Sequence, residues 1–132
     1  MRKLIFVLMF TSPILAADKG LLDAICQVES NGKANAIGDG GRAVGAFQIH
    51  KIMVREVNRI SGRKYTYKDR LNKVKSRQMC NIFLNHAAKY IKRKKGSKPT
   101  LIELGRTWNG SYQGWKSKKT VKYGRKIAKQ LN

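Results

Sequence analysis

The segment Leu21-Leu22-Asp23-Ala24-Ile25-Cys26-Gln27-Val28-Glu29-Ser30 decides how this chain folds, because its apolar residues recur at helical spacing and its last turn holds a carboxyl group. Polar Asn31-Gly32 follows and ends the predicted helix. A carboxyl group at the end of a mostly apolar helix is partly removed from water, which raises its pKa and favours the protonated form at neutral pH. Glu29 therefore has the setting that a general acid requires.

The spacing of hydrophobic residues predicts that the rest of the chain is mainly α-helical. Beyond the helix over residues 20–30, we expect helices over 50–60 and 69–94, a further helix with Pro99 in its first turn, and a last helix over 118–130. Residues 31–45 hold five glycines and predict an irregular loop, in which Ala36-Ile37 and Ala43-Val44 could pair as a short β-ribbon. Residues 109–117 are predicted to form a polar, aromatic loop.

The N-terminal segment has the composition of a secretory signal peptide. Arg2-Lys3 is positively charged, residues 4–15 are mostly apolar, and Ala16-Ala17 offers small residues for cleavage. A retained membrane anchor is the alternative, although the apolar stretch is shorter than the roughly 20 residues that span a bilayer. The sequence thus predicts a signal peptide over residues 1–17 and one domain over 18–132, exported to the periplasm or the extracellular space.

Basic residues dominate the composition, with 29 Lys and Arg against 7 Asp and Glu and a formal net charge of +22. A surface of this kind attracts polyanions over long range. For an exported protein, the polyanions at hand are anionic polymers of the cell wall or envelope and anionic lipid head groups. Nucleic acid is not an expected partner, because export separates the chain from it and no recognised binding motif is present. We expect a monomer.

The two cysteines, Cys26 and Cys80, both fall on the apolar side of a predicted helix. In an oxidising compartment an even number of buried thiols favours a disulfide, with two separate core cysteines as the alternative. His50 and His86 show no ligand spacing with either cysteine, so no metal site is predicted. No other cofactor is expected.

Four motifs in order resemble those of the SLT-type lytic transglycosylases of the lysozyme-like superfamily. They are Glu29-Ser30, Gly45-Ala46-Phe47-Gln48-Ile49, Trp108-Asn109-Gly110, and Tyr123 three residues after Thr120. The usual signatures of that family are Glu-Ser, Gly-Leu-Met-Gln, Ala-Tyr-Asn and a late Tyr. Phe47 thus replaces Met, and Trp108 replaces Tyr. The resemblance covers residues 20–127, nearly the whole predicted domain.

This resemblance implies a small lysozyme-like helical domain with a cleft for the glycan strand of peptidoglycan. Glu29 would be the catalytic residue. It would first protonate the glycosidic oxygen between N-acetylmuramic acid and N-acetylglucosamine, and then assist attack by the muramyl 6-hydroxyl to leave a 1,6-anhydro end. The substrate-binding residues implied by the motifs are Ser30, Gly45, Phe47, Gln48, Ile49, Trp108, Asn109 and Tyr123. Trp108 could equally belong to the core. Secretion or conjugation machinery is a further possible partner.

Asp39 leaves a second enzymatic activity open. It follows Glu29 by ten residues, a placement that some lysozyme-fold hydrolases use for a second carboxylate. The alternative is an ordinary turn residue within Gly38-Asp39-Gly40-Gly41. If Asp39 faces the cleft, a hydrolytic muramidase becomes a candidate. A third candidate is a cationic protein that binds the cell wall or perturbs membranes on the same scaffold.

Overall fold

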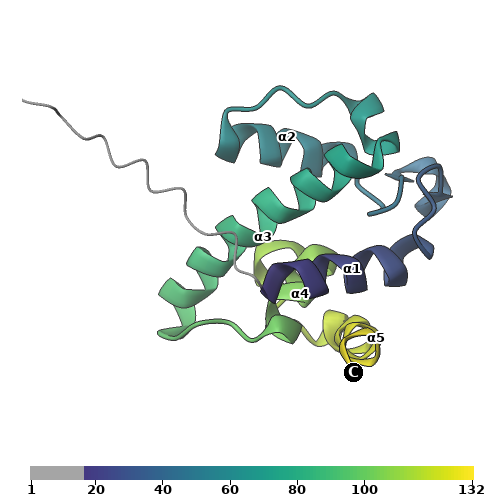
Figure 1. The fold of residues 1–132 in the computed structure, drawn as a ribbon. Coiled ribbons are helices and arrows are strands. Elements are labelled where there is room, and N and C mark those ends of the chain that lie inside the picture. The colour runs from purple at the N-terminus through teal and green to yellow at the C-terminus, as the bar shows by residue number, and fades with distance from the viewer. Residues whose placement is uncertain (1–16) are drawn as a thin grey trace, which may run out of the picture.

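The computed structural model describes residues 17–132, which form five α-helices and one small β-ribbon (Figure 1). The predicted signal peptide over residues 1–17 lies outside the described residues except for Ala17, with which the first helix begins. Within the described part of the chain, no helix is both long and apolar enough to span a membrane. The prediction of a small, mainly α-helical domain is confirmed.

The helices follow the predicted pattern closely. They are α1 (Ala17–Ser30), α2 (Lys51–Ser61), α3 (Lys73–Lys95), α4 (Leu101–Gly110) and α5 (Val121–Leu131). Gly62 and Gly96 end α2 and α3 in the left-handed conformation that glycine adopts readily. The predicted ribbon is also confirmed: β1 (Ile37–Gly38) pairs antiparallel with β2 (Ala43–Val44), and the 3-10 turn η1 (Asp39–Gly41) connects them.

The start of the long helix was predicted too early, because polar side chains cap two separate elements there. Residues 67–71 form a 3-10 turn, η2 (Tyr67–Leu71), which begins with a capping box between Thr66 and Asp69. Asn72 then caps α3, its side chain accepting a hydrogen bond from the Lys75 N–H. Likewise α4 begins after Thr100, which forms a capping box with Glu103, so Pro99 lies before the helix rather than in its first turn.

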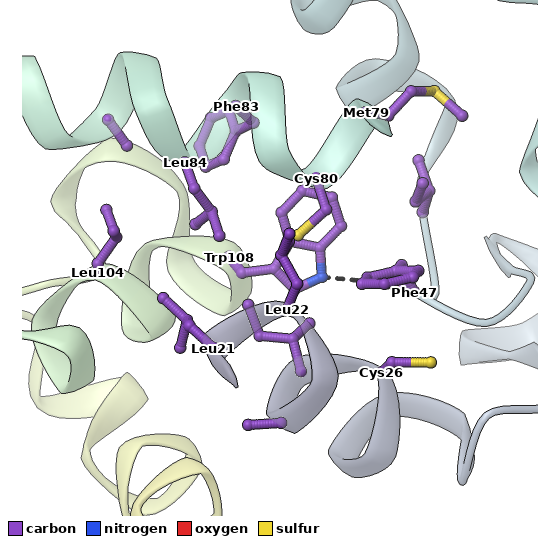
Figure 2. Packing of buried hydrophobic residues seen from close by; sticks show 14 of the residues in the cluster. Leu21, Leu22, Cys26, Phe47, Met79, Cys80, Phe83, Leu84, Leu104 and Trp108 are labelled. Carbon is purple, nitrogen blue, oxygen red and sulfur yellow. Dashed lines mark hydrogen bonds between the residues drawn. The ribbon is translucent and has the colours of Figure 1, made fainter. Parts of the chain in front are cut away.

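The helix α3 is the axis of the domain (Figure 1). Helix α2 packs along one side of it, whereas α1 and α4 contact it from the other side and α5 packs against both of these. The side chains between them form one apolar core, part of which is drawn in Figure 2. Its fully buried large members are Leu21, Ile25, Phe47, Ile49, Val54, Val57, Met79, Phe83, Leu84, Ile91 and Ile127.

The predicted disulfide is not formed in the structure. Cys26 on α1 and Cys80 on α3 are both buried but are not bonded to each other. Figure 2 shows their sulfur atoms pointing in different directions. Each thiol fills space in the apolar core as a small hydrophobic side chain does, which is the alternative that the sequence left open.

Candidate functional site

Two adjoining cavities form one groove beside the end of α1. The smaller cavity, of about 290 Å³, contains Glu29. The larger, of about 450 Å³, extends along α2. Four residues line both cavities: Gln48, His50, Trp108 and Asn109. The groove therefore lies where the end of α1, the segment after β2 and the end of α4 come together.

Glu29 lies in the last turn of α1 and is half-buried in the wall of the groove. Burial raises the pKa of this carboxyl above its ordinary value, because the charged form loses solvation. The Tyr123 hydroxyl and, more weakly, the positive charge of Lys126 act in the opposite direction, but burial is the larger effect. The site thus favours a protonated carboxyl that opens onto a cavity, as the sequence predicts for a general acid.

Tyr123 approaches Glu29 from α5. Its hydroxyl is buried and faces the Glu29 carboxyl, although the geometry falls short of a standard hydrogen bond. Burial and the neighbouring Glu29 charge both raise the pKa of Tyr123. The phenol therefore keeps its proton at any physiological pH and can donate to Glu29 whenever that group is ionised.

The floor of the groove is the turn over residues 45–49. Gly45 has a positive φ of 86° and donates its N–H to the Ala36 carbonyl at 2.8 Å. A side chain at this position would overlap the backbone carbonyl of Arg70. Gln48 also has a positive φ, and its amide donates to the carbonyls of Ala36 (3.2 Å) and Gly45 (2.9 Å). Close packing of two backbone segments therefore requires glycine here and fixes the Gln48 amide at the groove.

Two side chains hold this turn against the helices. The Ser30 hydroxyl, next to Glu29, donates to the Ala46 carbonyl at 2.7 Å. The Trp108 indole N–H donates to the Phe47 carbonyl at 3.1 Å, as the dashed line in Figure 2 shows. These hydrogen bonds join α1 and α4 to the same turn, so the position of Glu29 relative to the groove is fixed by backbone contacts.

The structure separates the predicted substrate-binding residues into two groups. Gln48, Ile49, Trp108 and Asn109 line the groove. The residues that do not line either cavity are Ser30, Gly45, Phe47 and Tyr123, and the Phe47 side chain is wholly buried in the core. Trp108 is both a core residue and a groove residue, because it is only 8% exposed and still borders both cavities.

Asp39 is likewise both a turn residue and a groove residue. It lies in the turn η1 with a positive φ of 49° and borders the same cavity as Glu29. Its side chain is 47% exposed, and its two oxygens contact different basic side chains, Oδ1 that of Arg42 at 3.1 Å and Oδ2 that of His50 at 3.3 Å. The carboxylate is therefore held at the exposed rim by two neighbouring side chains.

The wall that α2 contributes to the groove was not predicted from the sequence. The larger cavity is bordered by Ile52, Met53 and Glu56 on this helix, and by Ser111 and Tyr112 opposite it. Ile52 fits the apolar spacing of a core residue but is 68% exposed. Ile52 and Glu56 are four residues apart and so share a helix face, and this juxtaposition of an apolar and an acidic side chain is the signal that could have marked the wall.

The groove offers the Glu29 carboxyl, whose pKa burial raises, together with the carboxyls of Asp39 and Glu56 at its border and several neutral polar groups. Gln48 and Asn109 offer amide donors and acceptors, and Trp108 adds an aromatic edge. Among residues 17–132, no cluster of His, Cys, Asp or Glu is placed to hold a metal ion. The arrangement suits a polar, ring-containing ligand that receives one proton.

The chain was compared with models of known protein families. A family model described as the transglycosylase SLT domain matches residues 14–120, which is most of the chain. The matched span contains Glu29, the turn with Gln48, and Asn109, whereas Tyr123 lies just beyond it. Comparison with curated proteins and with solved structures gives no match.

Proposed function

Because the chain belongs to the transglycosylase SLT family, whose members act on peptidoglycan, we propose that it is an exported lytic transglycosylase that cleaves the β-1,4 bond between N-acetylmuramic acid and N-acetylglucosamine. The observation that carries this proposal is the Glu29 carboxyl. It is half-buried, its pKa is raised by burial, and it lines a groove that is also lined by amide and aromatic side chains.

In the proposed reaction Glu29 acts first as an acid and then as a base. The carboxyl proton goes to the glycosidic oxygen as the bond from that oxygen to the muramyl C1 breaks, and N-acetylglucosamine leaves as an alcohol. The Glu29 carboxylate then takes the proton of the muramyl 6-hydroxyl as this oxygen bonds to C1. A 1,6-anhydro ring results, no water is consumed, and Glu29 regains its proton.

Neighbouring groups assist by position and charge. The Tyr123 hydroxyl and Lys126 stabilise the carboxylate that exists between the two steps, since both lower the pKa of Glu29. Gln48 and Asn109 orient the sugar through their amides, and the Trp108 ring forms an apolar wall. These roles require one ionisable carboxyl in the groove, because the substrate supplies its own nucleophile.

Hydrolysis is the second candidate, and one observation favours it: Asp39 borders the same cavity as Glu29. A glycoside hydrolase that uses two carboxyls needs the second one as a base or nucleophile beside the sugar. Both oxygens of Asp39 are instead paired with Arg42 and His50. These pairs favour the transglycosylase, in which Asp39 has no chemical role.

Digestion of purified peptidoglycan, with products analysed by mass spectrometry, tests the proposal. We expect anhydro-muramyl ends from the protein and a loss of at least about a hundredfold in rate for Glu29→Gln, which keeps the shape of the side chain but removes the acid. Asp23→Asn is the matched control, because Asp23 lies on the same helix, is exposed and pairs only with Arg77 among the described ion pairs.

The other outcomes separate the alternatives. Reducing muramyl ends that depend on both Glu29 and Asp39 would establish a muramidase. Products that Glu29→Gln leaves unchanged, or no products at all, would overturn both enzymatic proposals. Binding to cell walls without cleavage would then favour a cationic binding protein, in keeping with the net charge of +22. Fractionation of cells that express the full chain tests export separately.

A further inference from the structure

A third cavity, of about 430 Å³, opens beside the groove. It meets the larger groove cavity at His50 and Ile52, which border both. Its other borders are the η1 turn with Arg42, the first residue of α2 at Lys51, and Arg70 of η2. We call this cavity the basic pocket. A side chain at Gly40 or Gly41, which also border it, would meet no atom within 4 Å, so the pocket is open at that end.

Arg70 gives the basic pocket a buried positive charge. The residue is only 8% exposed, and its guanidinium donates to three backbone carbonyls: Tyr67 at 2.8 Å, Ile49 at 3.0 Å and Arg42 at 3.4 Å. Among the described residues it forms no ion pair with a carboxylate. A buried guanidinium is stabilised further when an anion approaches it, because neutral carbonyls do not balance its charge.

Other positive groups surround the same space. The Lys51 ammonium lies 5.0 Å from the centre of the Tyr67 ring, and the Arg70 guanidinium lies 5.6 Å from the same centre. Lys51 is also the first residue of α2, an eleven-residue helix whose N-cap, His50, makes no side-chain hydrogen bond to the helix. The helix therefore directs free N–H groups and the positive end of its dipole toward this end of the pocket.

The acid at the rim, Asp39, offsets only part of the charge of the pocket. Asp39 pairs with Arg42 and His50 at the rim, and it borders the Glu29 cavity rather than the basic pocket. Of the three permanent cations that border the pocket, Arg42 is paired with Asp39, whereas Lys51 and Arg70 form no ion pair among the described residues, and no carboxylate lines the cavity. This asymmetry favours an anionic ligand.

We propose that the basic pocket binds a carboxylate of the peptide side chain carried by a peptidoglycan strand in the groove, so that strands bearing peptides are preferred to bare glycan. The inference rests on the proposed function, since it assumes that the groove holds a peptidoglycan strand. The pocket adjoins the groove at His50 and Ile52, so a short branch from a bound sugar reaches it. The peptides of peptidoglycan carry free carboxylates, which a guanidinium and an ammonium bind well.

Binding alone provides the first test, and it does not depend on cleavage. The protein is titrated with N-acetyl-alanyl-glutamate, a small diacid, and with its neutral diamide, while backbone amides are followed by NMR. We expect the diacid to shift Gly40, Gly41 and Ile52 selectively and the diamide to leave them in place. Equal effects of the two probes, shifts spread over the whole lysine-rich surface, or tighter binding of inorganic phosphate than of the diacid would each overturn the proposal.

The second test measures preference for peptide-bearing strands. Rates are compared on peptidoglycan and on the same glycan after removal of its peptides by an amidase. We expect Lys51→Gln to lower the ratio of the two rates about fivefold, the scale of one partly exposed ion pair. Lys51→Arg should restore the ratio. Lys98→Gln, an equal loss of charge in the exposed α3–α4 connection, should not change it.

These tests also distinguish failure of the inference from failure of the proposed function. If the protein cleaves peptidoglycan but Lys51→Gln and Lys98→Gln change the ratio of the two rates equally, the transglycosylase proposal stands and the proposal for the basic pocket is overturned. Selective binding of the diacid without any cleavage would support an anion site on a protein that is not a transglycosylase, and so overturn the proposed function.

Discussion

The floor and the rim of the groove are built from adjacent stretches of chain and have opposite physical character. The floor, residues 45–49, is closely packed: Phe47 and Ile49 are buried, and hydrogen bonds from Ser30 and Trp108 hold the turn to two helices. The rim, residues 39–42, is exposed along its whole length and is held to the rest of the groove by the pairing of Asp39 with His50.

The comparison explains why two carboxyls that border one cavity differ. Glu29 lies against the floor, where burial raises its pKa and keeps a proton available. Asp39 lies on the exposed rim, where its two carboxylate oxygens contact the side chains of Arg42 and His50. Asp39 thus lacks the burial that acts on Glu29. Packing around the carboxyl, rather than distance along the chain, therefore decides which one can do acid chemistry.

Adding the same methyl group to the floor and to the rim tests this difference in packing and has the largest expected effect. Gly45→Ala would force a side chain into the Arg70 carbonyl at a position with a φ of 86°. We expect it to cost about 3 kcal/mol or more in the free energy of unfolding and to abolish activity. Gly40→Ala has a similar φ of 63° but meets no neighbouring atom, so we expect about 1 kcal/mol. Chemical denaturation measures both, and equal costs would show that the floor is not packed as described.

A smaller effect is expected when only the hydroxyl behind Glu29 is removed. Tyr123→Phe deletes a group that lowers the pKa of Glu29, so the pKa should rise further. Activity that needs protonated Glu29 falls as pH rises through this pKa, and the alkaline limb of the pH–rate profile should therefore move to higher pH. The rate at its maximum should fall about tenfold, the scale of one hydrogen bond to a charged group.

Tyr90→Phe is the control for this experiment, since its hydroxyl accepts a hydrogen bond from Gln113 and is not among the groups that shift the pKa of Glu29. It should leave the pH profile in place. An alkaline limb that moves to lower pH in Tyr123→Phe, or that moves equally in both variants, would contradict the assigned contact between Tyr123 and Glu29.

Helices were predictable here because periodic burial is a local signal. Their boundaries near residues 66–73 were not, because the outcome there depends on which polar side chain captures which backbone N–H. Thr66 and Asp69 cap one turn, and Asn72 caps the next helix. A continuous helical pattern in the sequence does not reveal this competition.

The candidate site was predictable only in part. The motifs identified Glu29, Gln48 and Asn109, and the structure brings all three to one cavity. The wall on α2 was missed because periodicity cannot distinguish a core face from a face that lines a groove, as Ile52 illustrates. The disulfide prediction was wrong for a related reason. A disulfide forms only if two helices turn their cysteines toward each other, and the residues next to each cysteine in the sequence do not show this.

Other missing information lies in contacts between a side chain and a distant carbonyl. The indole of Trp108 donates to Phe47, 61 positions away, and Ser30 donates to Ala46, 16 positions away. The sequence does not indicate which carbonyl will act as the acceptor, since every residue has one. The motifs therefore identified residues that matter without showing that Ser30 and Phe47 act by holding the floor in place.

The smallest expected effect belongs to the rim and gives the finest test of the comparison. Asn adopts the left-handed conformation at least as readily as Asp, so Asp39→Asn at a φ of 49° removes charge with little backbone strain. If Asp39 only pairs with Arg42 and His50, we expect anhydro products and a rate within about threefold of the original, as for an exposed ion pair. A loss of about a hundredfold would instead mean that a rim carboxylate does chemistry despite its surroundings. Gly40→Ala, which perturbs the same turn but keeps the carboxylate, separates that result from mere disturbance of the rim.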